Sequence, residues 1–269
     1  MTTALITGAS SGIGAAFADR LAADGHDLVL VARSVAAMEE HAERLRRAHG
    51  IAVDVVGQDL AEPDAPERVV AALGGKPVDL LVNNAGFGTC GRFEDIGAER
   101  DRRQIMVNVA ALVGLTHAFV PGMLERGRGG VINVASTAGL QISPHFSVYA
   151  SAKTFVLNFS LALWAEYRGR GVDVLALCPG PVETPFFDAI GTRAAAVGGK
   201  FETPERVVDA ALKALARNRG YVVPGRSNFA LAHLMPRRPR KLVALIAKRV
   251  TRGVVGKVSS APSTVPVAS

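Results

Sequence analysis

The chain has 269 residues and a formal net charge of +7; 49% of its residues are hydrophobic and 20% are charged. This length fits one α/β domain or two smaller ones, and the composition supports a sizeable buried core. No apolar run predicts a membrane span, and Met1-Thr2-Thr3 leads directly into a predicted strand, so no signal peptide is expected. Cys90 and Cys178 lack metal or redox spacing; they are expected to be reduced thiols of a cytoplasmic protein without a metal site.

Positive charge is concentrated in the last sixty residues. Residues 1–209 contain 19 Lys and Arg against 24 Asp and Glu, whereas residues 210–269 contain 12 Lys and Arg and no acidic residue. The basic character therefore belongs to the C-terminal part, and such segregation predicts that this part meets something acidic.

The chain opens with a predicted strand, a glycine-rich turn and a helix. Residues 4–7 are apolar and β-prone, residues 8–14 are Gly-Ala-Ser-Ser-Gly-Ile-Gly, and helical spacing of apolar residues follows up to Gly25. Glycines let the backbone approach a ligand closely, and a helix N-terminus presents free N–H groups to a phosphate. The turn therefore predicts a phosphate site, to which Ser10 and Ser11 can add their hydroxyl groups.

A second predicted strand, residues 27–32, ends at Arg33. About 20 residues after such a turn, an acidic residue would bind the ribose 2′-hydroxyl of NAD, whereas a cation suits the 2′-phosphate of NADP. Arg33 therefore favours NADP. The alternative is an exposed arginine at the start of a helix.

Strands and helices alternate through the rest of the chain up to residue 225. Five more strands are predicted, at residues 52–56, 78–82, 130–135, 172–178 and 221–223. Helices are predicted between them, at residues 35–50, 63–73, 98–127, 147–169 and from Thr203 onward, while residues 185–200 show no firm period. The alternation predicts an α/β fold: a single Rossmann-like, doubly wound parallel sheet of about seven strands with helices on both faces.

Tyr149 and Lys153 lie four residues apart on a predicted helix, so their side chains share one face. A phenol has a pKa near ~10, and a neighbouring cation lowers it. The pair is therefore a candidate proton donor and acceptor, although taken alone the pattern also fits an ordinary exposed helix face. Ser136 follows strand 130–135, at the sheet end where ligands bind; a loop or helix-cap serine is the alternative.

The motifs together resemble those of the short-chain dehydrogenase/reductase family, of the NADP-preferring Tyr-x-x-x-Lys type. The matching residues are Thr7-Gly8-x-x-x-Gly12-x-Gly14, Asn83-Asn84-Ala85-Gly86, Asn108, Ser136, Tyr149, Lys153 and Pro179-Gly180. The resemblance covers residues 3–224. It implies NADPH-dependent reduction of a carbonyl compound to an alcohol, and family members often pair through the helix of Tyr149, which implies a homodimer or homotetramer.

The resemblance also implies roles for the catalytic residues. Tyr149 would be the general acid in reduction and the base in oxidation, and Lys153 would lower its pKa and hold the nicotinamide ribose. Ser136 would bind the substrate oxygen, and Asn108 would keep a water behind Lys153. The cofactor itself supplies the hydride.

The residues implied to hold NADP(H) follow the strand ends. They are Gly8, Ser10, Ser11, Gly12, Ile13, Gly14, Arg33, Asp59, Leu60, Asn84, Ala85, Gly86, Tyr149, Lys153, Pro179, Gly180, Val182 and Thr184. Asp59 and Leu60 are expected at the adenine, and Val182 and Thr184 near the carboxamide.

The substrate is expected to be apolar, because the segments around the predicted site offer no charged clamp. An apolar ketone, an aldehyde or a 3-oxoacyl compound fits best. Phe186 and Phe187 either cover the substrate or pack on the helix that follows, and His145 either faces the substrate or is solvated. Trp164 either contributes to a subunit interface or packs within the core.

Residues 226–257 form a basic amphipathic extension, and residues 258–269 are expected to be disordered. Apolar residues recur at helical spacing at Val243, Ile246, Ala247, Val250 and Val254. Basic residues lie toward the other side, at Lys241, Lys248 and Arg252. The helix either packs on the domain or a partner subunit, or lies on an anionic membrane surface as part of a peripherally bound reductase of lipid-like acyl substrates.

Two other functional classes fit parts of this sequence. An NADP(H)-binding regulator or scaffold without catalytic activity would lack one or more of the four catalytic residues. All four are present in this sequence. Nucleic-acid binding is not expected, because the tail lacks aromatic residues beyond Phe229 and a recognised motif.

Overall fold

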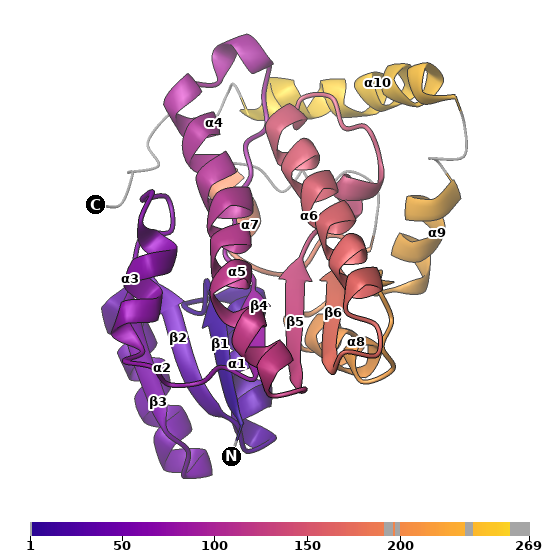
Figure 1. Ribbon diagram of the computed structural model, residues 1–269. Coiled ribbons are helices and arrows are strands. Elements are labelled where there is room, and N and C mark those ends of the chain that lie inside the picture. Colours follow the sequence, from indigo (N-terminus) through magenta and orange to yellow (C-terminus); the bar gives the residue numbers. More distant parts are fainter. Residues whose placement is uncertain (1, 191–195, 197–199, 235–238, 259–269) are drawn as a thin grey trace.

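A seven-stranded parallel sheet forms the centre of the protein, a computed structural model that describes residues 2–190, 196, 200–234 and 239–258 (Figure 1). The strands are β1 (Thr3–Thr7), β2 (Asp27–Ala32), β3 (Val53–Gly57), β4 (Leu80–Asn83), β5 (Gly129–Val134), β6 (Val172–Leu177) and β7 (Tyr221–Val222). Their order is β3-β2-β1-β4-β5-β6-β7. The predicted doubly wound fold is therefore confirmed, with strand ends that differ from the predicted ones by a residue or two.

Helices cover both faces of this sheet. They are α1 (Gly12–Ala23), α2 (Val35–His49), α3 (Ala65–Ala72), α4 (Ala98–Ile105), α5 (Ala111–Glu125), α6 (Ser147–Glu166), α7 (Phe186–Ile190), α8 (Pro204–Leu215), α9 (Arg226–Leu234) and α10 (Arg240–Val258). Helices α1, α2 and α8 pack on one face, and α3, α5 and α6 on the other (Figure 1).

Strand side chains divide between these two layers because successive residues of a strand point to opposite faces. Leu30, Ile6, Val82 and Ile132 stand in register across four strands and belong to the core beneath α1 and α8. Leu5, one position earlier, belongs to the core beneath α3 and α5. Burial on both faces explains why these strands are continuous apolar runs in the sequence.

The predicted helix at residues 98–127 is interrupted. Met106–Ala110 forms a π-helical turn between α4 and α5, and Asn108 lies in its middle. Residues 98–125 also form a helix long and apolar enough to cross a membrane by length and composition, which corrects the sequence-based expectation. Leu115 and Met123 are nevertheless buried against the sheet, as in the core helix of a globular fold.

Two helices were not predicted from the sequence. α7 has only five residues, so it shows no helical period, and α9 follows Gly225 without a capping signal. The region of residues 185–200 lies partly outside the described residues, as do Arg237, Arg238 and the predicted disordered segment except Val258.

α10 packs on the domain through a line of side chains that differs from the predicted stripe. Val243 and Thr251 are buried, and Ala247 between them is partly buried. Ile246 and Val250, which the sequence analysis assigned to the packing side, are 37% and 57% exposed. The buried line follows positions i, i+4 and i+8, so only one narrow side of this helix meets the domain.

Candidate active site

The site lies where the order of the strands reverses, between β1 and β4. Open α/β sheets bind ligands at such points, at the carboxyl ends of the strands. Here Thr7 Oγ1 accepts hydrogen bonds from the backbone N–H groups of Asn84 and Ala85, both at 3.0 Å. Asn84 Nδ2 donates in return to the carbonyl of Thr7 at 2.9 Å. These bonds hold the ends of the two strands together at this point of the sheet.

The glycine turn between β1 and α1 fits a phosphate. Gly8 and Gly12 have φ angles of 65° and 57°, which favour glycine. A Cβ atom on Gly14 would lie 2.2 Å from the carbonyl oxygen of Gly8, so no larger residue fits there. Ser11 stands at the N-cap of α1 and makes no side-chain capping bond. The first turn of α1 is therefore not capped by Ser11, and its N–H groups suit an anion.

The loop after β6 reaches this turn. A Cβ atom on Gly12 would lie 3.0 Å from Thr184 Cγ2, so Thr184 packs directly on the turn. Val182 is buried and pairs with Glu202 in a short parallel bridge, which holds the loop in place. The structure thus brings the predicted carboxamide-side residues to the same crevice as the predicted phosphate turn.

Tyr149, Ser136 and Lys153 converge beside the crevice. Ser136 hydrogen-bonds the Tyr149 phenol, and its Oγ also accepts from Ala138 N at 3.1 Å as the N-cap of a short 3₁₀ helix. Both functions proposed for this serine, as cap and as site residue, are therefore compatible. Lys153 Nζ lies 5.9 Å from the centroid of the Tyr149 ring and donates to Val134 O at 2.7 Å.

Burial controls the protonation of this pair. It raises the pKa of Tyr149 to about 12, while the Ser136 hydrogen bond acts in the opposite direction. Burial likewise lowers the pKa of Lys153 to about 8. The predicted lowering of the phenol pKa is therefore wrong for this structure, because loss of solvent outweighs the favourable partner. At neutral pH the phenol carries its proton and is a donor.

The π-helical turn places Asn108 behind Lys153. Asn108 Nδ2 donates to Phe87 O at 2.8 Å, and its Oδ1 accepts from Phe87 N at 3.2 Å. A Cβ atom on Gly86 would lie 2.4 Å from Asn108 Oδ1 and 3.3 Å from Lys153 Nζ. Gly86 therefore leaves the space that lets the strand end, the asparagine and the lysine meet.

Aromatic side chains form an apolar wall above Tyr149. The ring of Phe186 lies 5.6 Å from the ring of Tyr149, and Phe187 follows at 5.5 Å from Phe186. Phe201 continues the chain of rings at 5.5 Å from Phe187, and Phe146 is buried in the same cluster. The two phenylalanines of α7 therefore pack on each other, and Phe186 also contacts the ring of Tyr149, which is the position expected of a cover over the substrate.

Arg33 and Asp59 lie near each other beyond the ends of β2 and β3. Burial acts to raise the pKa of Asp59, but hydrogen bonds from Ala61 N and Arg103 outweigh it and lower this pKa, and the charge of exposed Arg33 adds to the lowering. The Asp59 carboxylate accepts from Ala61 N at 2.9 Å and from Arg103 Nη2 at 2.7 Å. This carboxylate is thus engaged by α4, which the sequence did not indicate. Leu60, the other residue expected at the adenine, has its side chain buried in the core.

His145 and Trp164, whose roles the sequence left open, have hydrogen-bond partners outside the group around Tyr149. His145 adopts a left-handed φ of 66°, and its Nδ1 lies 2.8 Å from Thr251 Oγ1 of α10. Trp164 Nε1 donates to Asn218 Oδ1 at 2.7 Å, within the same chain. Cys178 is fully buried, in agreement with its interpretation as a small apolar residue.

Asn228 of α9 supports the site but was not found from the sequence. Its amide group is buried against Gly180, where a Cβ atom would lie 2.6 Å from Asn228 Cγ. Its Nδ2 donates to Lys200 O at 3.2 Å and to Pro224 O at 3.3 Å. Only the three-dimensional structure brings α9 to the loop after β6.

Replacing Asn228 by Ala is expected to lower the free energy of unfolding by about 1–3 kcal/mol, because two backbone carbonyls lose their buried donor. The loop with Pro179 and Gly180 also loses its support, so the Kd for the cofactor should rise. Urea unfolding and cofactor titration measure the two effects. Ser227→Ala, one residue earlier on an exposed position, is the control and should change neither.

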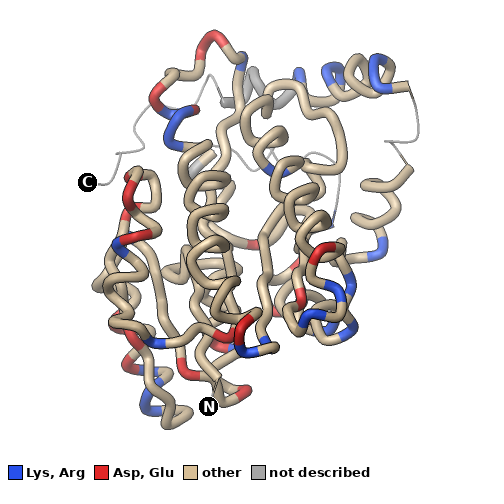
Figure 2. Tube along the Cα trace, viewed as in Figure 1, with Lys and Arg blue, Asp and Glu red and all other residues tan. Residues whose placement is uncertain are grey.

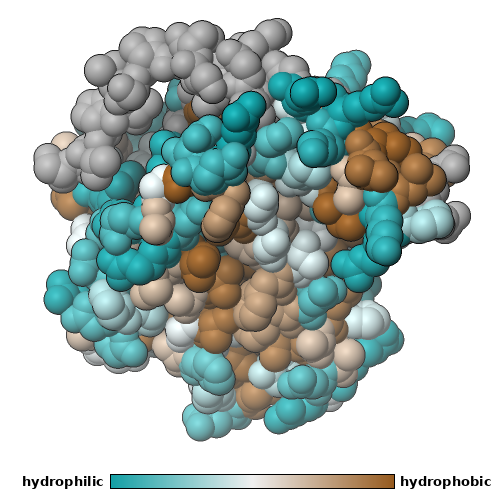
Figure 3. All heavy atoms as spheres, turned by 90° about the horizontal axis from the view of Figure 1, so that it is seen from above, coloured by the Kyte–Doolittle hydropathy of each residue, from teal (hydrophilic) through white to brown (hydrophobic). Residues whose placement is uncertain are grey.

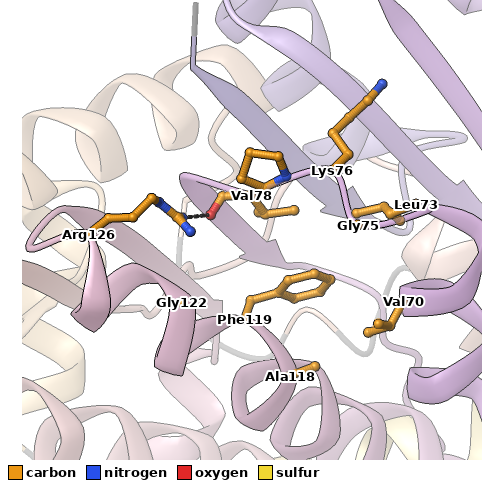
Figure 4. A pocket seen from close by; sticks show the side chains of 10 residues that line it. Val70, Leu73, Gly75, Lys76, Val78, Ala118, Phe119, Gly122 and Arg126 are labelled. Carbon is orange, nitrogen blue, oxygen red and sulfur yellow. Dashed lines mark hydrogen bonds between the residues drawn. The ribbon is translucent and has the colours of Figure 1, made fainter.

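A pocket of about 180 Å³ lies at the opposite end of the sheet, between α3 and α5 (Figure 4). Val70 and Phe119 line it, and Arg126 Nη2 donates to Val78 O at 2.8 Å beside it. Val78 precedes β4, whereas the residues around Tyr149 follow the strands. This pocket is therefore separate from the candidate active site.

Comparison with known proteins defines the class. The model of the family described as short chain dehydrogenase matches residues 2–195. The chain therefore belongs to the short-chain dehydrogenase/reductase family, and is an oxidoreductase of the Rossmann-like type.

Several relatives resemble it over most of its length. 7beta-hydroxysteroid dehydrogenase of Collinsella aerofaciens is 32% identical over 232 residues, which cover 85% of this chain and 88% of the relative. Very-long-chain 3-oxoacyl-CoA reductase of Anas platyrhynchos is 34% identical over 187 residues, which cover 67% of this chain and 60% of the relative. A solved short-chain dehydrogenase from Sphingobium yanoikuyae in complex with NADPH has a TM-score of 0.80 and 33% identity, covering 95% of this chain and 96% of its own.

Proposed function

We propose that the protein reduces an apolar ketone, aldehyde or 3-oxoacyl compound to an alcohol with NADPH. The observation that carries the proposal is the Tyr149 phenol, hydrogen-bonded to Ser136, beside buried Lys153 and beneath the rings of α7. Names of relatives support the class of substrate, since they include a hydroxysteroid dehydrogenase and a 3-oxoacyl-CoA reductase.

In this proposal each residue acts at a stated atom. Ser136 Oγ and the Tyr149 hydroxyl group hold the carbonyl oxygen, and Tyr149 gives that oxygen its proton. The bound cofactor supplies the hydride. A phenol that keeps its proton at neutral pH suits reduction, in which it must be the acid. Lys153 and Asn108 hold the cofactor side of the site, and Gly8, Gly12 and Gly14 the phosphates.

The test is NADPH oxidation by the purified full chain with a panel of apolar ketones, aldehydes and 3-oxoacyl thioesters. We expect turnover with at least one apolar member and little with charged keto acids, because the wall of Phe186, Phe187 and Phe201 offers no ionic partner. Bound NADPH without turnover of any member would favour the second candidate, an NADP(H)-binding regulator or scaffold.

Arg33→Ala should raise the Kd for NADPH by about tenfold or more and leave the Kd for NADH within about twofold, because only NADPH has the 2′-phosphate that a guanidinium binds. Fluorescence titration of each nucleotide gives both constants. Arg44→Ala, an exposed arginine of α2, is the matched control. Equal losses for the two nucleotides would contradict the assignment of Arg33 to the phosphate.

The proposed assembly is a homodimer or homotetramer that works in the cytoplasm or on a membrane facing it. Phe155 of α6 supports a subunit contact, since it is 43% exposed and stacks on Phe159 at 5.7 Å. The catalytic domain is proposed to span residues 1–225 and the extension residues 226–257. A reductase held on a membrane is favoured by one specific observation, the outer surface of α9 and α10.

A further inference from the structure

α10 leaves a set of large apolar side chains in solvent. Its buried side meets the domain through Val243 and Thr251, which are 3% and 4% exposed. The opposite side carries Leu245 at 65% exposure together with Leu242, and Ile246 and Val250 are exposed between this side and the buried one. An exposed leucine is common on protein surfaces, but a contiguous group along one helix marks an interaction site.

α9 also leaves large apolar side chains in solvent, and basic residues accompany those of α10. The exposed apolar side chains of the two helices are Phe229, Leu231, Leu234, Leu242, Leu245, Ile246 and Val250. Among the side chains that the structure describes, the exposed basic ones on α10 are Arg240, Lys241, Lys248, Arg249 and Arg252. We name these residues the α9–α10 face. Figure 2 shows blue but no red along α10, and Figure 3 shows a brown apolar area beside teal atoms at the position of α10 in Figure 1.

We propose that the α9–α10 face docks on an anionic membrane surface. The pattern is that of an interfacial helix, in which apolar side chains enter the boundary of the bilayer and flanking cations meet anionic head groups. The absence of any Asp or Glu after Asp209 removes the like-charge repulsion that would oppose such a surface.

Charge also decides between the occupants that this face suits. A second copy of the chain would bring one set of Lys and Arg against another, which opposes association. A nucleic acid would satisfy the cations and leave Leu245 and its neighbours in water. An anionic bilayer satisfies both sets of side chains.

The buried side of α10 connects this face to the active site. Thr251 Oγ1 lies 2.8 Å from Nδ1 of His145, and the carbonyl of His145 accepts from Gly91 N at 2.9 Å. The next residue, Phe146, is buried in the same aromatic cluster as Tyr149. The helix that meets the bilayer therefore also contacts the loop that bounds the substrate pocket.

A consequence rests on the proposed function. A carbonyl substrate dissolved in the bilayer would reach the pocket along the side covered by α10, so lipid-like substrates are favoured over small water-soluble ones. This consequence concerns turnover, whereas docking concerns binding alone, and the two are measured separately.

The test is co-sedimentation of the full chain with vesicles of phosphatidylcholine alone or of phosphatidylcholine with phosphatidylserine, at low and high salt. We expect binding to the anionic vesicles, weakened by salt because exposed charges are screened. The double variant Lys248→Glu/Arg252→Glu should reduce binding by about tenfold or more, since each cation near the surface contributes to attraction. Lys213→Glu/Arg217→Glu carries the same change of charge on and just after α8, away from α10 in Figure 1, and should bind like the wild type.

Leu242→Gln/Leu245→Gln tests the apolar part at unchanged charge and should also reduce binding, with Tm unchanged because both side chains are exposed.

Equal binding by this variant and the wild type, or no preference for anionic vesicles, would overturn the proposal. So would DNA binding without vesicle binding, or a dimer that this variant dissociates while vesicles fail to bind. Reduction of a small soluble ketone should be unchanged in every variant, so failure of the proposed chemistry is distinguished from failure of docking.

Discussion

Tyr149→Phe is expected to lower kcat for carbonyl reduction by about 10³-fold, within the range that general acid catalysis contributes. The substitution removes only the hydroxyl group that Ser136 binds, and the ring keeps its place between Phe186 and the neighbouring apolar side chains. The Kd for NADPH should therefore change by no more than about twofold. Stopped-flow turnover and nucleotide titration measure the two quantities on the same preparation.

Two controls separate this chemistry from a loss of structure. Tyr167→Phe removes a phenol at the end of α6, away from Ser136, and should retain full activity. Urea unfolding of Tyr149→Phe should show a wild-type or slightly lower midpoint, because the bond to Ser136 is lost while Ser136 Oγ keeps its bond from Ala138 N. If Tyr149→Phe turns substrate over at the wild-type rate, Tyr149 is not the acid.

Lys153→Met should abolish measurable turnover and at the same time stabilise the fold. Burial lowers the pKa of Lys153 from 10.5 to about 8. At about 1.4 kcal/mol per pKa unit, keeping the buried group charged at pH 7 costs the native state about 3 kcal/mol. Loss of the bond from the charged Nζ to Val134 O costs about 2 kcal/mol, so the free energy of unfolding should rise by only about 1 kcal/mol.

The dependence of the protein's stability on pH follows from the lowered pKa of Lys153. Below pH 8 the lysine is charged in both states, and the native state carries the whole penalty. Between pH 8 and 10.5 the native state loses the proton while the unfolded chain still binds it, so the penalty fades. Wild-type stability should therefore rise toward that of Lys153→Met across this window. A variant that is less stable than the wild type at pH 7 would contradict this account of Lys153.

The main strands and the catalytic helix could be predicted because their signals are local. β1, β2, β5 and β6 are runs of apolar residues buried on both faces, and a Cβ atom on Gly8 or Gly14 would come within 3.0 Å of backbone atoms. α7 could not be predicted, since five residues make too short a helix to show a period. The π-helical turn around Asn108 does not interrupt the helical spacing of apolar residues in the sequence. The sequence therefore predicts a continuous helix there.

Site features that depend on tertiary contacts escaped the sequence for a different reason. The bond from Arg103 to Asp59, the packing of Asn228 on Gly180 and the bond from Thr251 to His145 join segments far apart in the chain. No local pattern announces them. The pKa of Tyr149 was mispredicted because the spacing of Tyr149 and Lys153 reveals the partner but not the depth of burial.

The most direct test of the proposed reaction follows the hydride itself. NADPH carrying deuterium at both positions of the reactive nicotinamide carbon is incubated with an apolar ketone that the panel identifies, and the product alcohol is examined by mass spectrometry and NMR. We expect one deuterium on the carbinol carbon from the wild type, and none above background from Tyr149→Phe. An alcohol formed without the label, or labelled equally by both proteins, would contradict hydride transfer governed by Tyr149.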